Sequence, residues 1–159
     1  MQKITLSWIF RYISAVLLVV LCITSVPVAA CSSTPVYQLT ASERILVAKL
    51  IDHEDNASLE VAEAVAQVVL NRVQSPLFPG TVEGVIYQRG QFVGASTLVR
   101  MPDPSDLALQ AVDAVFGDGV DVCGDATFFF ELRIPPWKVA RGLTLVWSYQ
   151  NMGFWSQKV

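Results

Sequence analysis

An apolar helical pattern between Ser58 and Gln74 constrains the fold of this chain more than any other feature. Small and β-branched apolar residues recur there every three or four positions, at Val61, Ala62, Val65, Val68, Val69 and Val73. Ser58 carries the hydroxyl of a helix N-cap, and Glu60 places a negative charge in the first turn, where it complements the helix dipole. The alanines among these residues allow another element to approach closely. The pattern therefore predicts a helix, which the following "SPLFPG" ends.

A helix is also predicted to begin just after Thr40. The residues "TASE", Thr40 to Glu43, match a capping box, in which the threonine accepts from a first-turn amide and the glutamate reaches back to the cap. Apolar residues then recur on one side of the helix. This helix runs toward Glu54, and Asn56 marks its break.

The rest of the chain predicts one more full helix and a small sheet. Asp103 and Pro104 are start signals for a helix that Gly117 ends, whereas "TVEGVIYQRGQF" predicts a short helical turn that leads into a loop. The stretches "DATFFFEL" and "LTLVWSY" are rich in aromatic and β-branched residues, which indicates a small antiparallel strand pair. Helices first and a small sheet afterward predict an α+β fold that is mostly helical.

The N-terminus has the order of a secretory leader. Lys3 and Arg11 precede an apolar run from Ile13 to Ile23, and small residues follow in "VAAC". We favour a lipoprotein signal over residues 1–30, with Cys31 lipidated, a tether over 31–40 and a catalytic-like domain over 41–159. A plain signal-peptidase cut after Ala30 and an uncleaved signal anchor fit the same residues. All three alternatives predict an exported protein in the periplasm or cell envelope, and two of them attach it to the membrane.

Charge and cysteine content narrow the function classes. Without the basic residues of the leader, nine basic and 14 acidic residues remain, a net charge of −5, and no basic patch predicts a nucleic-acid partner. Cys31 and Cys123 are able to form a disulfide only if Cys31 is not acylated. His53 is the one histidine of the chain, and no Cys/His spacing predicts a metal site or a serine-histidine-aspartate triad.

The stretch "LIDHEDNAS", Leu50 to Ser58, gathers ionisable residues in a chain that is otherwise sparing with charge. A carboxylic acid that donates a proton at neutral pH needs a raised pKa, which burial against apolar groups provides. Glu54 stands at the end of one predicted helix and beside another, so it is our candidate proton donor. Asp52 and Asp55 are expected to point elsewhere, since successive helical positions diverge. The alternative is that the whole row is a solvated helix terminus, and that His53 is a surface or half-buried residue.

The central part of the chain resembles the cell wall hydrolase family typified by the spore-cortex-lytic enzymes SleB and CwlJ. The resemblance rests on "VVLNRVQSPLFPGTVEGVIYQRGQF" and, more loosely, on "ATFFF…PPW". The residues that match are Glu54, Asn71, Arg72, Phe78, Pro79, Thr81, Val82, Tyr87, Gln88, Gly90, Gln91, Phe92, Ala126, Thr127, Phe129 and Trp137.

The resemblance implies a lysozyme-like domain that acts as a lytic transglycosylase on the β-1,4 bond between N-acetylmuramic acid and N-acetylglucosamine of peptidoglycan glycan strands. Glu54 is implied as the single acid and base of this reaction, which calls for no metal and no cofactor.

The other matched residues have a functional and a structural interpretation each. Gln91, Tyr87, Trp137 and Phe92 are candidate substrate-binding residues, although Gln91 could equally tie two loops together and the aromatic residues could be core, which we favour for Phe92. For Asn71 and Arg72 we expect helix capping and loop anchoring.

Two departures from the family pattern support an alternative function. "DNAS" replaces a turn that ends in glycine and glutamate in the family, and Met152 stands where the family tends to have a histidine. The alternative is a catalytically inactive envelope lipoprotein that binds peptidoglycan or a partner hydrolase.

Overall fold

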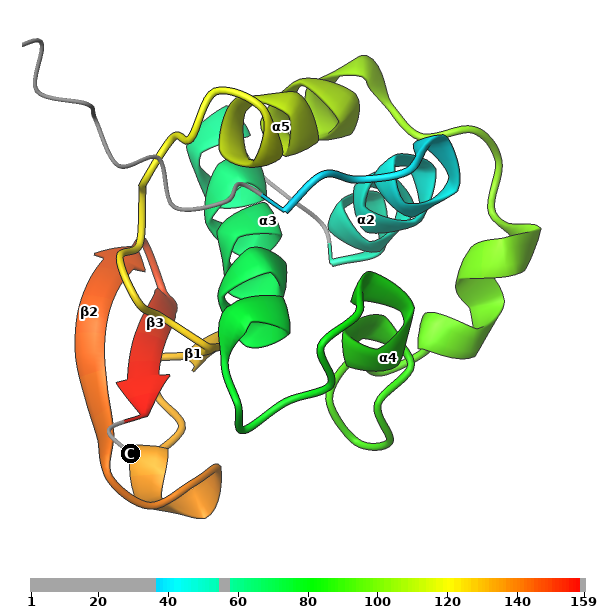
Figure 1. The fold of residues 1–159 in the computed structure, drawn as a ribbon. Helices are drawn as coiled ribbons and strands as arrows, with labels where there is room; N and C mark the ends of the chain where they lie inside the picture. The colour runs from blue at the N-terminus through cyan, green and yellow to red at the C-terminus, as the bar shows by residue number, and fades with distance from the viewer. Residues whose placement is uncertain (1–36, 55–57, 158–159) are drawn as a thin grey trace, which may run out of the picture. The chain divides into compact units, whose positions relative to one another are not determined.

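The computed structural model describes residues 37–54 and 58–157, which form a helical layer with a small sheet (Figure 1). The elements follow one another as α2 (Ala41–His53), α3 (Leu59–Gln74), α4 (Val82–Ile86), the 3₁₀ helix η1 (Ala95–Arg100), α5 (Asp106–Phe116), β1 (Phe128–Glu131), the 3₁₀ helix η2 (Pro136–Lys138), β2 (Leu143–Tyr149) and β3 (Met152–Gln157). Helix α3 packs against α2, α4, α5 and β1. The predicted α+β class is confirmed.

Helix α3 supplies much of the core, as its pattern predicts. Ser58 caps it by accepting from the Val61 amide at 3.3 Å. The residues of α3 that are buried are Val61, Ala62, Ala64, Val65, Ala66, Gln67, Val68, Val69, Arg72 and Val73. Alanines on this helix are completely buried, which fits the close approach of neighbouring helices.

The predicted capping box of α2 is present. The Thr40 hydroxyl accepts from the Glu43 amide at 3.2 Å, and the Glu43 carboxylate accepts from the Thr40 amide at 2.9 Å. Helix α2 ends at His53 with Glu54 as its C-cap. The predicted break at Asn56 lies outside the described residues.

Helix α5 begins later than the sequence predicts. Its N-cap is Ser105, whose hydroxyl accepts from the Ala108 amide at 3.2 Å, so the predicted start at Pro104 is wrong. The reason is a contact that is distant in sequence: the amide and hydroxyl of Ser105 both donate to the Asp52 carboxylate at 2.7 Å. The predicted end at Gly117 is confirmed.

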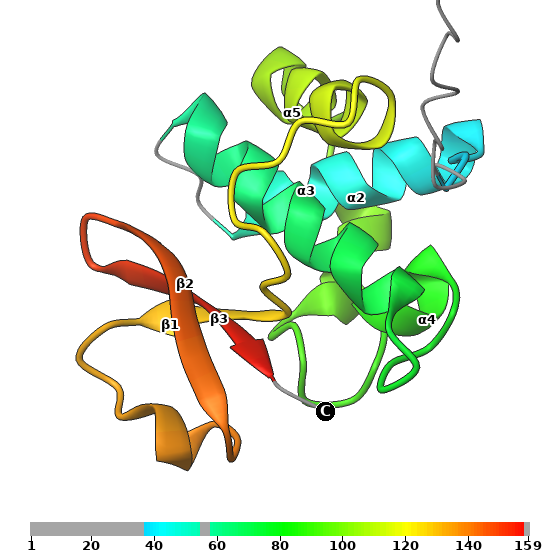
Figure 2. The ribbon, with the colours of Figure 1, turned by 60° about the vertical axis from the view of Figure 1, so that its left-hand side comes forward.

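The two predicted strands form, but they do not pair with each other. Each pairs antiparallel with β3, which the sequence did not predict, so the strand order is β1-β3-β2 (Figure 2). Phe129 lies opposite Phe154, and Trp147 lies opposite Phe154 on the other side. The aromatic side chains on this face pack toward the helices: the Phe129 ring stacks on Phe154 at 5.7 Å and lies 6.2 Å from Phe92.

The predicted leader, Cys31 and the part of the predicted tether up to residue 36 lie outside the described residues. Residues 37–40 of that tether are described: the Tyr37 hydroxyl donates to the Glu43 carboxylate at 2.8 Å, and Leu39 packs against the core. Among the helices of the described part, none combines the length and apolar character that a membrane crossing requires.

Candidate active site

The Glu54 carboxyl is half-buried at the end of α2. The Glu54 amide donates to the carbonyls of Leu50 at 3.0 Å and Ile51 at 3.2 Å, which fixes the backbone at the last turn. Its side chain is 23% exposed, and this burial raises the pKa of the Glu54 carboxyl, while His53 beside it acts in the opposite direction. Glu54 therefore keeps its proton to a higher pH than a solvated glutamate does.

The end of α2 rests against the residues that follow the matched "GQF" segment. Gly94 is the residue before η1, with φ +79°, and a Cβ built on it would come within 2.8 Å of Nε2 of His53. The histidine ring therefore occupies the space that a side chain at residue 94 would need. This contact brings the helix end that carries Glu54 next to the start of η1.

The acidic residues of "LIDHEDNAS" do not share one task. Asp52 points to the start of α5, where both of its carboxylate oxygens accept from Ser105. The expected divergence of Asp52 from Glu54 is confirmed, and Asp55 lies outside the described residues.

The candidate substrate-binding residues have different environments. Tyr87 at the C-cap of α4 is 41% exposed, and Trp137 on η2 is 73% exposed, so both rings are accessible. Gln91 is half-buried in the turn that follows α4, where its backbone N–H donates to the backbone carbonyl of Gln88 at 3.1 Å. Phe92 is 7% exposed, and its ring lies 4.8 Å from the guanidinium carbon of Arg72, so the core interpretation of Phe92 fits its position and the sugar-stacking one does not.

Asn71 and Arg72 anchor a loop to α3, as the sequence predicts. The side-chain NH₂ group of Asn71 donates to the backbone carbonyls of Gly124 and Ala126, both at 2.8 Å. Arg72 donates to the Thr127 carbonyl at 2.6 Å. Its guanidinium lies over the rings of Phe78, Phe92 and Phe128. Burial lowers the pKa of Arg72 to about 10, so the side chain stays a cation at neutral pH and gains from these rings.

Gln67 is a structural residue that the sequence reasoning missed. It is 6% exposed; its carbonyl accepts from the amides of Val122 and Cys123 at 2.7 and 2.9 Å, and its NH₂ group donates to Asp121 and Gly124 at 2.6 and 2.8 Å. The sequence does carry a signal for this role: Gln67 stands among the alanines and valines of the helix, and a buried side-chain amide needs hydrogen-bond partners.

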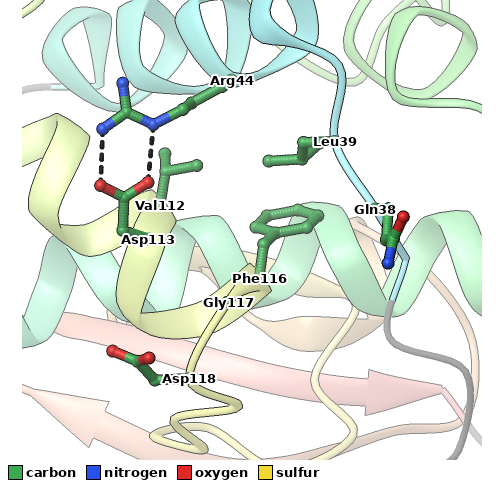
Figure 3. Close-up of a pocket in the computed structure, with 8 residues that line it drawn as sticks. All are labelled: Gln38, Leu39, Arg44, Val112, Asp113, Phe116, Gly117 and Asp118. Carbon is green, nitrogen blue, oxygen red and sulfur yellow. Dashed lines mark hydrogen bonds and ion pairs between the residues drawn. The ribbon is translucent and has the colours of Figure 1, made fainter.

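A surface hollow of about 510 Å³ lies at the other end of α2 (Figure 3). In it, Arg44 forms a two-pronged ion pair with Asp113, with Nε–Oδ1 and Nη2–Oδ2 distances of 2.6 and 2.5 Å, and the Phe116 ring lines the floor. Arg44 is in the first turns of α2, whereas Glu54 follows its last turn. The hollow is therefore separate from the candidate active site.

The chain thus has an α+β fold in which helix α2 ends at a half-buried glutamate whose pKa is raised by burial. The chain belongs to the cell wall hydrolase family, whose model matches residues 56–155. The matched range begins two residues after Glu54.

Curated relatives support this family membership. A spore cortex-lytic enzyme of Oceanobacillus iheyensis is 43% identical over 68 residues, and one of Bacillus subtilis is 36% identical over 77 residues. These matches cover 42% and 46% of this chain but only 24% and 25% of the relatives. The chain thus spans about a quarter of the length of these relatives.

Solved structures show the same fold over a larger part of the chain. The catalytic domain of Bacillus cereus SleB has a TM-score of 0.66 at 25% identity, with 76% of this chain and 94% of that domain covered. The catalytic domain of the germination-specific lytic transglycosylase SleB from Bacillus anthracis has a TM-score of 0.64 at 27% identity, with 76% and 98% covered.

Proposed function

We propose that this protein degrades peptidoglycan as a lytic transglycosylase, with Glu54 as its single acid and base. The bond cleaved is the β-1,4 link from N-acetylmuramic acid to N-acetylglucosamine. The observation that carries the proposal is the half-buried Glu54 carboxyl, whose pKa is raised by burial. Membership of the cell wall hydrolase family supports it, and so does the likeness to a solved catalytic domain that is named a lytic transglycosylase.

In the proposed reaction, one carboxyl performs two proton transfers. Glu54 gives its proton to the glycosidic oxygen, the bond from the anomeric carbon to that oxygen breaks, and N-acetylglucosamine leaves with a free 4-hydroxyl. The Glu54 carboxylate then takes the proton of the muramic C6 hydroxyl while the C6 oxygen bonds to the anomeric carbon. The product is a 1,6-anhydro ring, no water is consumed, and Glu54 ends protonated as it began. Gln91, Tyr87 and Trp137 are the proposed sugar contacts, because their side chains are at least partly accessible.

The raised pKa gives the reaction a defined pH dependence. The first step needs protonated Glu54, so activity falls as pH rises through the pKa of this carboxyl, and raising that pKa extends activity toward neutral pH.

Product analysis with Glu54→Gln tests the proposal. The purified protein is incubated with peptidoglycan, and anhydro-muropeptides are measured by mass spectrometry. We expect Glu54→Gln to lower their release about 10²- to 10⁴-fold, the usual contribution of a general acid. The matched control is Glu60→Gln, at an exposed glutamate in the first turn of α3, which should leave release unchanged. Equal release by the wild type and Glu54→Gln would refute the enzymatic proposal.

A binding module is the second candidate function. Two observations favour it: the family match begins at residue 56, after Glu54, and the "DNAS" turn departs from the family pattern. In this alternative, the protein binds glycan strands or a partner hydrolase without cleaving. Sedimentation with insoluble peptidoglycan, without any anhydro product, would support it.

Export is a proposal that concerns residues 1–40, most of which lie outside the described residues. We propose a leader over residues 1–30, lipidation of Cys31 and a tether over 31–40, which together place the domain at the cell envelope. Globomycin, which blocks lipoprotein signal cleavage, should leave the uncleaved precursor in producing cells. A processed protein of unchanged mass under globomycin would exclude the lipid anchor.

A further inference from the structure

His53 stands beside Glu54, and the proposed reaction gives it no task. Its Nδ1 lies 3.8 Å from Oε1 of Glu54. This Nδ1 atom is buried, and within residues 37–54 and 58–157 it has no hydrogen-bond partner. A buried nitrogen without a partner costs about 1–3 kcal/mol, so its position calls for an explanation.

The surroundings of the ring leave Glu54 as the carboxylate that His53 faces in the described structure. On one side the ring meets Gly94, whose missing Cβ leaves the space that Nε2 and Cε1 occupy. The nearby Thr97 hydroxyl donates to the Gly94 carbonyl at 2.7 Å. On α2 itself, the Asp52 carboxylate is engaged by Ser105. Asp55 lies outside the described residues and therefore enters the experiment as a variant.

We propose that His53 is a positioning residue for Glu54. The Nδ1–H of His53 donates to the carboxylate that forms once Glu54 has protonated the glycosidic oxygen. This inference rests on the proposed function. A movement of about 1 Å closes the gap from 3.8 Å to hydrogen-bond distance. A hydrogen bond to an ionised carboxylate is stronger than one to the neutral acid, so the bond tightens when the carboxylate appears.

The proposed bond holds the carboxylate between its two proton transfers. His53 neither gains nor loses a proton; its Nδ1–H remains on the ring while Oε1 accepts. The other carboxylate oxygen is then free to take the proton of the C6 hydroxyl. The packing of the ring on Gly94 keeps it from swinging away from Glu54.

Two amide substitutions separate this role from simple space filling. In His53→Asn the amide nitrogen takes the approximate place of Nδ1, whereas in His53→Gln it takes the approximate place of Nε2. Both side chains are neutral amides, and urea denaturation of each variant measures its own cost to folding. We expect His53→Gln to lower kcat about 10- to 100-fold with KM little changed, and His53→Asn to recover most of the loss.

A titration that does not depend on activity gives the decisive measurement. The side-chain carboxyl ¹³C resonance of Glu54, assigned with Glu54→Gln, is followed against pH in the wild type, both His53 variants and Asp55→Asn. Because His53 favours the carboxylate form, its replacement by glutamine should move the titration of Glu54 to higher pH. His53→Asn should titrate near the wild type.

The two measurements distinguish the failure of this inference from that of the proposed function. If the Glu54 titration is the same in the wild type and in His53→Gln, or if Asp55→Asn alone moves it, the role of His53 is refuted even in an active enzyme. If the titration moves as expected in a protein that releases no anhydro product, the contact stands and the proposed reaction fails.

Discussion

Gly94 is the residue that allows the end of α2 to rest against η1. Its φ of +79° lies in the left-handed region, and a Cβ at this position would lie 2.8 Å from Nε2 of His53, which is too close for a side chain. Gly90 has nearly the same backbone angle, φ +80°, but nothing within 4 Å of the position of a Cβ. The chain thus offers a matched pair of glycines that differ in the space around them.

Alanine substitution at these two positions should separate backbone strain from the clash with His53. Gly90→Ala should lower the free energy of unfolding by about 1 kcal/mol, because it adds only the strain of a left-handed backbone. Gly94→Ala should lower the free energy of unfolding by the same strain and by about 1–3 kcal/mol more, because its Cβ would clash with the His53 ring. Urea denaturation measures both. In a His53→Ala background, the excess cost of Gly94→Ala should disappear; an excess that persists would show that the ring is not the obstacle.

At the level of elements, polar side chains of α3 bind the segment that leads into the sheet. Gln67, Asn71 and Arg72 succeed one another along one side of the helix, and together they bind the backbone of residues 122–127. This segment leads directly into β1. Cys123, Ala126 and Thr127 are buried, so these bonds give partners to backbone groups that burial would otherwise leave unpaired. The loop therefore depends on the helix for its conformation.

Gln67→Ala tests this dependence. The substitution leaves the amides of Val122 and Cys123 without their acceptor, which should cost about 2–4 kcal/mol of unfolding free energy. Gln74→Ala, on the same helix but exposed, is the control and should stay within about 0.5 kcal/mol of the wild type. Chemical denaturation monitored by tryptophan fluorescence provides the measurement. Equal effects of the two substitutions would mean that the loop keeps its conformation without Gln67.

The sequence predicts elements whose signals are local and misses those that depend on distant contacts. The capping box at Thr40 and the apolar period of α3 lie within single helices, and both are confirmed. Strand β3 has a weaker local signal: Gly153 is a poor strand former, yet it is required because the side chains of Leu132 and Leu145 lie over it. The sequence predicts the start of α5 wrongly for a similar reason: the Ser105 cap is bound by Asp52, which belongs to another helix.

For the candidate site, too, the sequence predicts local features and misses contacts between distant residues. A carboxylate at a predicted helix end, beside an apolar helix, gives the expectation that Glu54 is buried. The resemblance to the cell wall hydrolase family is what favours Glu54 as the proton donor over a solvated helix terminus. The contact of His53 with Gly94 joins residues 41 positions apart, and no periodicity encodes it. The environments of Tyr87 and Phe92, one exposed and one buried, also depend on which side of the loop faces Arg72.

For the whole molecule, the state of Cys123 connects the domain to the proposed processing of the N-terminus. Cys123 is completely buried, and its thiol donates to the Ala64 carbonyl at 3.5 Å. Burial, with Asp121 and Asp125 nearby, raises the pKa of this thiol to about 12. Since the thiolate is the reactive form, Cys123 should be inert toward thiol reagents in the native protein at pH 8 and should react only on unfolding.

Thiol labelling therefore reports on both the fold and the anchor. In the processed protein, we expect no labelling in the native state and labelling of Cys123 in urea, without any reductant, because lipidation of Cys31 leaves Cys123 unpaired. Peptide mass spectrometry identifies the labelled residue, and Cys31→Ser is the control that removes the alternative partner. If Cys123 labels in urea only after reduction, and does so without reductant in Cys31→Ser, the two cysteines form a disulfide. Since an acylated Cys31 is unable to form that bond, this result would exclude the lipid anchor and leave an oxidised form of the exported protein.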